Sequence, residues 1–223
     1  MKEIAEQDYQ IPLVPRNGIN CYLVEDTLVD AGIRSSFMKI RKSLRNWKVF
    51  RHLLTHAHPD HQGSSRAICE AFEIPLWTSV REKKNAESGK VTVNYPGQQN
   101  VITRFQQKFW SGLGAPVSHT VEEGDRIGNF TVIATPGHSP GHISLFRPED
   151  HVLIVGDTLV HMNLLTTIPG LHEPPDMFTT DKSQNRKSIR KLAELNPKIL
   201  AFGHGPVLRN EGQLQRWIER ELG

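Results

Sequence analysis

The chain has 223 residues, of which 37% are hydrophobic and 23% are charged, and its formal net charge is +3. These values are typical of a globular protein, and the length suits a single domain over residues 1–223 with a sizeable core. Because lysine and arginine are scattered, and no run is apolar enough for a signal peptide or a transmembrane helix, we expect a cytoplasmic protein without nucleic-acid or membrane partners.

The first fifty residues predict strands followed by a helix. Alternating apolar and polar residues, interrupted by turn residues, indicate the strands. They are predicted at residues 9–14, 20–24 and 27–30. Apolar side chains at intervals of three or four predict an amphipathic helix over residues 35–47. The apolar run of residues 49–54 then predicts a buried strand, which ends at Thr55.

The segment at the end of this strand, residues 55–61, has the sequence THAHPDH. Three imidazoles and a carboxylate packed this closely would desolvate and repel one another. Neutral imidazole nitrogens and carboxylate oxygens suit zinc, iron or manganese, and four such groups in one loop are better shared between two ions than crowded onto one. A helix predicted over residues 64–72 follows, so the loop lies at a strand end, the usual place for a site. The competing interpretation is a histidine-rich surface loop with adventitious metal affinity.

After a short predicted strand at residues 75–78, regular patterning fails and we predict an insertion at about residues 81–115. A long, weakly patterned segment in a compact domain is often a functional lid, or a helical insertion with its own small core. Its aromatic residues Phe109 and Trp110 are candidate walls of a substrate pocket. They could instead pin the insertion to the body of the domain, and the insertion could serve as a subunit contact.

Three more ligand-type residues follow short apolar runs and are flanked by glycine. They are His138, Asp157 and His204, after the predicted strands at residues 130–134, 151–155 and 199–201. We therefore expect several strand ends to meet at one edge of the core and to carry metal ligands there. His142 is a tempting extra ligand, but packing or hydrogen bonding beneath the loop is the preferred interpretation, because a strand follows it directly.

The pattern His-x-His-x-Asp-His, followed by these three residues, resembles the metallo-β-lactamase superfamily over nearly the whole chain. The resemblance implies an α+β fold with four layers, αββα, in which two mixed β-sheets are flanked by helices. It also implies two metal ions in one site. The implied ligands are His56, His58 and His138 for the first metal, Asp60, His61 and His204 for the second, and Asp157 as the bridge between them.

The branch of the superfamily is indicated by position 157. Aspartate there looks more like glyoxalase II, the lactonases and related hydrolases than like class B β-lactamases, which often carry cysteine. Lactonases use a tyrosine near the segment after Asp157, whereas we expect Tyr9, Tyr22 and Tyr95 to lie elsewhere. The chain ends with two helices predicted over residues 182–195 and 211–222, which argues against the full glutathione site of glyoxalase II.

The segment after Asp157 is apolar for a loop and should lie at the mouth of the site. An apolar surface beside polar catalytic groups suggests a pocket for a substrate with a hydrophobic part. The predicted substrate contacts are Trp110, His161, Met162, Leu164 and Leu165. For Asp30, at the end of an early strand, two roles are open: a hydrogen bond to the histidine loop or a plain turn carboxylate.

These observations predict a metal-dependent hydrolase that cleaves an ester, thioester or lactone bond of a small, partly hydrophobic molecule. Two cations, most simply Zn²⁺ with iron or manganese as alternatives, would lower the pKa of a shared water from about 15.7 toward neutrality. Asp60, a ligand close to the resulting hydroxide, is the predicted catalytic residue that passes a proton to the leaving group. The alternatives are an iron-dependent oxidoreductase of the sulfur dioxygenase type, using mainly the first three histidines, and a phosphodiesterase. A homodimer is left open.

Overall fold

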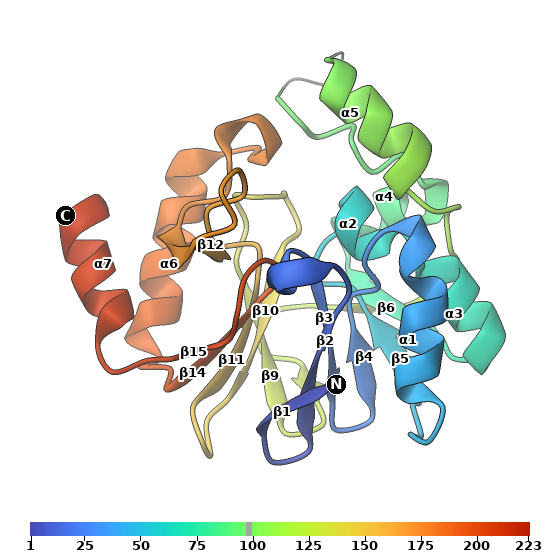
Figure 1. The fold of residues 1–223 in the computed structure, drawn as a ribbon, viewed down its shortest axis with the longest axis horizontal. Coiled ribbons are helices and arrows are strands. Elements are labelled where there is room, and N and C mark those ends of the chain that lie inside the picture. Colours follow the sequence, from blue (N-terminus) through green and yellow to red (C-terminus); the bar gives the residue numbers. More distant parts are fainter. Residues whose placement is uncertain (97–99) are drawn as a thin grey trace.

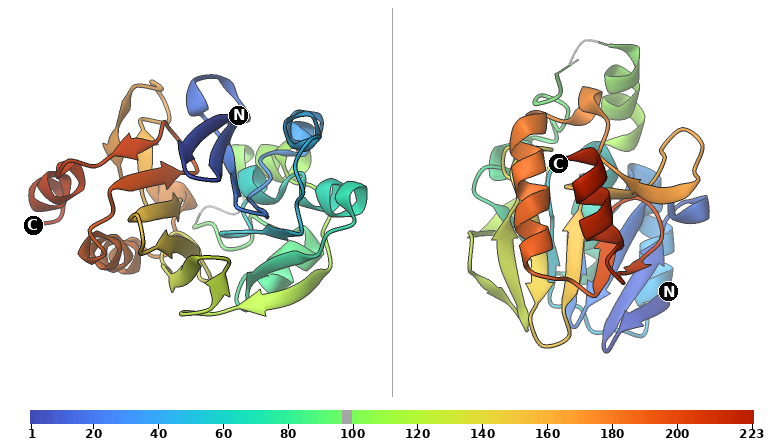
Figure 2. Two further views of the ribbon diagram at one scale, coloured as in Figure 1. Left: turned by 90° about the horizontal axis from the view of Figure 1, so that it is seen from below. Right: turned by 90° about the vertical axis from the view of Figure 1, so that its left-hand side faces the viewer.

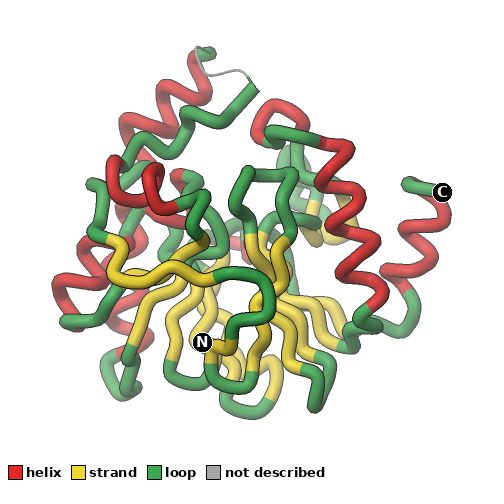
Figure 3. Tube along the Cα trace, turned by 180° about the vertical axis from the view of Figure 1, so that it is seen from behind, coloured by secondary structure: helices red, strands yellow, loops and turns green. Residues whose placement is uncertain are grey.

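The computed structural model describes residues 1–96 and 100–223, and two β-sheets stand face to face at its centre (Figure 1). Figure 2 shows the four layers: helices α1 Phe37–Leu44 and α3 Ser65–Phe72 cover one sheet, and α6 Lys182–Glu194 and α7 Gln213–Glu221 cover the other. The same layers are seen from behind in Figure 3, with strands between helices on both flanks. The predicted α+β fold with two mixed sheets flanked by helices is confirmed. Residues 97–99, within the predicted insertion, lie outside the described residues.

The first sheet has seven strands in sequence order. They are β1 Lys2–Ala5, β2 Asp8–Pro12, β3 Asn20–Val24, β4 Thr27–Val29, β5 Arg51–Leu53, β6 Leu76–Ser79 and β7 Val117–Val121. The first four strands pair antiparallel, and the pairs from β4 to β7 are parallel. Parallel strands need long crossovers, which explains why helices and the insertion fall between β4 and β7.

The second sheet has six strands in the order β15-β14-β11-β10-β9-β8. They are β8 Arg126–Ile127, β9 Phe130–Ala134, β10 Ile143–Arg147, β11 Val152–Gly156, β14 Ile199–Phe202 and β15 Leu208–Arg209. Only the β11–β14 pair is parallel, and helix α6 lies in its crossover. A separate hairpin, β12 Val160–Met162 and β13 Pro169–His172, stands beside this sheet.

Strand β3 shows how the layers are held together, because both of its faces are buried. Tyr22 and Val24 face the second sheet and pack in one cluster with Leu145. Cys21 and Leu23 point the other way. There they pack in a cluster with residues of α1 Phe37–Leu44 and α3 Ser65–Phe72. Each fully buried apolar side chain of this size contributes roughly 1.5–3 kcal/mol, so a strand with two apolar faces fixes the sandwich and its outer helices together.

Helices α6 Lys182–Glu194 and α7 Gln213–Glu221 cover the outer face of the second sheet. Helix α6 begins after Asp181, whose carboxylate accepts a hydrogen bond from the Gln184 amide. Ile189 of α6 and Trp217 of α7 belong to the same core cluster as residues of β11 and β14. The predicted C-terminal helices at residues 182–195 and 211–222 are therefore found, with ends that differ by one or two residues.

The chain also forms elements that the sequence did not predict. Strands β1 and β7 lie at the two edges of the first sheet, where only one face packs and few apolar residues mark the strand. The predicted loop after Asp157 folds back as the hairpin β12–β13. The remaining helices are α2 Pro59–Gln62, α4 Lys83–Ser88, α5 Val101–Phe105, the π-helical turn Gln106–Trp110 and the 3-10 turns Pro15–Asn17, Arg34–Ser36 and Asp176–Phe178.

A buried ion pair lies at the end of the sandwich opposite to helix α5. Arg147 of β10 contacts the buried Asp8 at 2.7 Å and Asp150 at 2.8 Å, and its guanidinium lies 4.8 Å from the centre of the Phe130 ring. Burial raises the pKa of Asp8 to about 7, although the charge of Arg147 opposes this rise. The carboxyl group therefore depends on Arg147 to stay charged.

Among the described residues, no helix combines the length and the apolar composition needed to cross a bilayer.

Candidate metal centre

The histidine loop leaves strand β5 in an extended conformation and turns into helix α2. His58 is extended, with φ −97° and ψ 161°, and Pro59 opens the helix, where a proline loses no hydrogen bond. The extended part brings the rings of His56 and His58 to a centroid distance of 4.4 Å. Asp60 and His61 are placed on the following helical turn. One loop thus presents its four ligand-type residues in two pairs.

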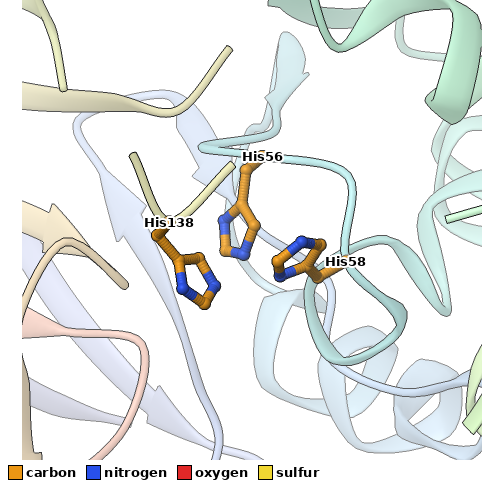
Figure 4. Close-up of side chains that lie close together, drawn as sticks. All are labelled: His56, His58 and His138. Carbon is orange, nitrogen blue, oxygen red and sulfur yellow. The ribbon is translucent and has the colours of Figure 1, made fainter. Parts of the chain in front are cut away.

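His138 comes from the second sheet, on the loop between β9 and β10. Figure 4 shows its ring facing those of His56 and His58. One nitrogen of each of these three imidazoles lies within 4.8 Å of the others. The loop can pass here because Gly137 has φ +137° and because any side chain at Gly137 would collide with the Asn185 backbone. The first predicted ligand group is therefore brought together.

A second group adjoins the first. Asp60, His61 and His204 offer ligand atoms within 4.8 Å of one another, and His56, His61 and Asp157 do the same. His204 Nε2 lies 3.2 Å from Asp60 Oδ2 and 3.0 Å from Asp157 Oδ2. A Cβ at Gly203 would come within 2.0 Å of Asp157 Oδ1, so only glycine allows this approach. Asp157 lies between the two groups, as a bridging carboxylate would.

Unpaired polar atoms test whether these residues fit metal ions. In the described part of the chain, the Nε2 atoms of His56, His58 and His138 are buried and have no hydrogen-bond partner. For two of these rings the other nitrogen is held in place. His56 Nδ1 lies 3.0 Å from the Thr55 hydroxyl, and His138 Nδ1 lies 3.3 Å from that of Thr179. A buried polar atom without a partner costs about 1–3 kcal/mol, which a divalent cation would offset by accepting these lone pairs. The donor set fits such ions.

The pKa shifts of the histidines differ between the two ligand groups. Burial, with the neighbouring imidazoles, lowers the pKa of His56 and His58, and burial lowers the pKa of His138 to about 4. Burial also disfavours charge on His204, yet the carboxylates of Asp157 and Asp60 outweigh it and raise the pKa to about 10. These directions favour neutral imidazoles in the first group, as cation binding requires, whereas a cation bound by the second group would have to displace the proton that the carboxylates favour on His204.

A cavity of about 560 Å³ opens directly above the two groups. His58, Asp60, His138, Asp157 and His204 form its floor. The remaining described lining residues are Val14, Gly18, Ile19, Ile33, Tyr95, Ile102, Trp110, Val160, Leu164, Leu165, Pro174, Pro175, Met177 and Phe178. The volume is within the range of small-molecule sites.

Three of the five predicted substrate contacts line the cavity, and the other two lie outside its described lining. Trp110, Leu164 and Leu165 line it. His161 does not: its Nδ1 lies 2.8 Å from the Pro206 carbonyl oxygen, and its ring borders a separate surface hollow. Met162 is buried and is absent from the described lining. Val160 of β12 lines the cavity, and His161, its neighbour along the strand, points to the other face. Met162 is packed inside the protein.

Tyr95 was expected to lie away from the site, and that expectation is wrong. It lines the cavity, is 2% exposed, and its ring lies 4.6 Å from that of His58 and 5.2 Å from that of Phe178. Its chain segment is a turn without periodic pattern, so no sequence signal placed it. Phe109, the other candidate wall, is 54% exposed and is not among the described lining residues.

Comparison with known proteins agrees with this architecture. The model of the metallo-beta-lactamase superfamily matches residues 14–204, which is most of the chain and includes all seven predicted ligands. The chain belongs to the metallo-β-lactamase superfamily. Several of its relatives are named as hydrolases, among them the probable metallo-hydrolases YflN and YybB of Bacillus subtilis.

Three relatives from the superfamily illustrate its range. Probable metallo-hydrolase YflN of Bacillus subtilis (strain 168) is 34% identical over 169 residues, which are 69% of this chain and 63% of that protein. Hydroxyacylglutathione hydrolase GloC of Haemophilus influenzae is 28% identical, with 83% of this chain and 85% of that protein covered. The crystal structure of TTHA1623 in a di-iron-bound form has a TM-score of 0.68 and 26% identity, over 94% of this chain and 96% of that one.

Two buried residues, Asp30 and His142, hold the ligand loops in place by hydrogen bonds. Asp30, with φ +61°, accepts hydrogen bonds from the Thr55 amide at 2.9 Å and from its hydroxyl, and its Oδ2 lies 2.8 Å from His61 Nδ1. Of the two roles left open for Asp30, bonding to the histidine loop is confirmed. His142 accepts from the Asp157 amide at 3.0 Å and contacts the Thr135 hydroxyl at 2.8 Å, so its expected place beneath the loop is also confirmed.

We predict that Asp30→Asn weakens metal binding while the protein stays folded. The change replaces one of two accepting oxygens by a donor, which would then oppose the Thr55 or His61 donors. Partners of metal-binding histidines are typically worth 10- to 100-fold in metal affinity, so competition with a chelator should show a loss of that order. The control is Asp26→Asn on the same hairpin, where Asp26 pairs with Arg51. Equal metal affinity in the two variants would contradict the role of Asp30.

Proposed function

We propose that this chain is a hydrolase with two metal ions, most simply zinc, and that it cleaves an ester-like carbonyl bond. The observation that carries the proposal is the pair of adjoining ligand groups at the floor of the cavity, with Asp157 between them. His56, His58 and His138 would hold one ion, and Asp60, His61 and His204 the other. Two cations held in this way lower the pKa of a shared water toward neutrality and polarise a carbonyl oxygen.

Asp60 is the residue that we propose to carry the proton. It lines the cavity, so its carboxylate can reach a bound molecule. Burial raises the pKa of Asp60, but the hydrogen bond from His204 and the charges of His61 and His204 outweigh this and lower it. Asp60 is therefore a carboxylate at neutral pH in the metal-free chain, and a cation held by His61 and His204 would supply positive charge at the same place and keep it ionised. It can accept the proton of the attacking water and return it to the leaving oxygen or sulfur.

The cavity supports a carbonyl substrate over a phosphodiester. Among the described lining residues no lysine or arginine is present, whereas a phosphodiester chain needs cationic contacts along its backbone. The second alternative, an iron-dependent oxidoreductase, draws support from the di-iron form of TTHA1623. A dioxygenase that uses mainly the first three histidines would not need the second ligand group, so we place the hydrolase first.

The test is metal analysis of the purified protein together with a turnover panel. We expect close to two equivalents of zinc per chain and hydrolysis of at least one of a lactone, a thioester and a carboxylic ester, with no turnover of bis(p-nitrophenyl) phosphate. About one equivalent of iron with oxygen consumption, and no carbonyl hydrolysis, would overturn the proposal in favour of the oxidoreductase.

A further inference from the structure

The five predicted metal ligands that line the cavity form its floor, the metal floor, and the cavity above them is apolar. Every charged side chain among its described lining residues belongs to the predicted ligand set. Beyond that set, the polar side-chain atoms are the Tyr95 hydroxyl and the Trp110 indole nitrogen. A charged group lying between these walls would lose its hydration without gaining an ionic partner, which is costly.

Two facing segments continue the apolar surface from the metal floor to solvent. On one side are Ile102 of α5 and Trp110 of the π-helical turn, and on the other are Leu164 and Leu165 at the tip of the β12–β13 hairpin. Ile102 is 50% exposed and Leu165 is 95% exposed, although both line the cavity. Figure 1 shows α5 and the hairpin on opposite sides of the strand ends that carry the ligands. The apolar surface therefore reaches the rim of the molecule.

We infer that the substrate is uncharged beyond its reacting carbonyl and carries an apolar chain, which runs from the metal floor between Trp110 and Leu164 toward Ile102 and Leu165. The inference rests on the proposed function only in placing a carbonyl at the metal ions. It excludes acyl carriers whose recognition depends on carboxylate or phosphate groups held inside this cavity.

The size of the effect follows from the burial of methylene groups. Each methylene moved from water into an apolar cavity should tighten binding about fourfold, which corresponds to about 0.8 kcal/mol. The gain should continue with chain length until the chain reaches Ile102 and Leu165, and should then level off. A carboxylate placed at mid-length should weaken binding by about tenfold or more.

The test uses methyl ketones, which offer a carbonyl and an alkyl chain but no bond to hydrolyse. Binding of 2-butanone to 2-undecanone to the zinc-loaded protein would be measured by calorimetry. We expect Kd to fall stepwise with chain length, and 6-oxoheptane-1-sulfonate, whose charged group is a weak metal ligand, to bind at least about tenfold more weakly than 2-octanone, which it matches in length. A Kd independent of chain length, or equal affinity for the ketone and the keto sulfonate, would overturn the inference.

Two pairs of variants would show where the alkyl chain of the ligand lies. Leu165→Asp should weaken binding of 2-undecanone by about tenfold and leave 2-butanone unchanged. Its control is Ile168→Asp, on the same hairpin, because Ile168 is 64% exposed and does not line the cavity in the described structure. Trp110→Ala should act in the same way, with Phe109→Ala as its control. Because Leu165 is 95% exposed, Leu165→Asp leaves the fold intact even if Trp110→Ala does not fold. Equal effects of Leu165→Asp and Ile168→Asp would count against the proposed path.

Failure of this inference is distinguishable from failure of the proposed function. Chain-length-dependent ketone binding without turnover of any ester, thioester or lactone would support the apolar substrate and overturn the hydrolase. Carbonyl hydrolysis together with ketone binding that is independent of chain length would support the hydrolase and overturn the apolar substrate.

Discussion

Replacing Asp157 by alanine should remove hydrolysis and reduce the bound metal below two equivalents per chain. Asp157 lies between the two ligand groups, with its Oδ2 3.0 Å from His204 Nε2 of one group and 3.8 Å from His138 Nε2 of the other, and no other carboxylate in the described groups adjoins both sets of histidines. Residues that only support ligands are worth 10- to 100-fold in affinity or activity, so loss of a bridging ligand should cost at least about a hundredfold in kcat. Elemental analysis and a turnover assay on the best substrate of the panel would measure both effects.

Asp176→Ala provides the control for this variant. Asp176 is exposed and paired with Lys182, beside Pro174 and Pro175 of the cavity wall, but it is outside the ligand set. It should keep two equivalents of metal and its turnover. Full metal content and full activity in Asp157→Ala would show that the bridging assignment is wrong.

Replacing Arg147 by methionine should destabilise the fold by about 3–5 kcal/mol at pH 8, without touching the metal centre. The buried Asp8 would lose its ionic partner, and methionine restores only part of the packing against Phe130. Urea unfolding at fixed metal content would measure the free energy of unfolding. Arg66→Met is the control, because Arg66 and Glu70 form an exposed pair on one helix, which contributes about 0.5 kcal/mol.

The loss in Arg147→Met should depend on pH in a defined direction. The pKa of Asp8 is raised from 3.8 to about 7 in the folded protein, so its contribution to stability is fully present below about pH 4 and is lost as pH rises through 7. Arg147 lowers this pKa, and its removal extends the loss to higher pH. The destabilisation should therefore be larger at pH 8 than at pH 5, and Asp8→Asn in the same chain should recover much of it. A loss that is equal at both pH values would contradict this explanation.

The ligand groups could be foreseen from sequence because local and global signals agree. The predicted ligands follow the ends of β5, β9, β11 and β14, which are mostly buried, and these strand ends meet at one edge of the sandwich. Asp30 was harder to judge. Its bonds to Thr55 and His61 depend on the pairing of β4 with β5 in register, which residue spacing does not reveal.

Which residues form the cavity walls depends on how chain segments pack against one another, rather than on the sequence pattern within each segment. Tyr95 lies in a turn, so only the packing of the insertion against His58 and Phe178 decides its position. His161 and Met162 were predicted from a loop, whereas the segment forms a hairpin in which Val160 faces the cavity, His161 points to the other face and Met162 is packed inside the protein. Leu164 and Leu165 escape this constraint at the hairpin tip, where the backbone turns.

The two walls of the cavity belong to segments that carry none of the predicted metal ligands. Ile102 and Trp110 come from the insertion, and Leu164 and Leu165 from the hairpin, whereas the ligands follow framework strands of the two sheets. We therefore expect that mutations in the walls can accumulate without change to the predicted ligands. In evolutionary terms, a fold of this kind can change what its cavity accepts by changing two surface segments, while the ligand-type residues are inherited intact.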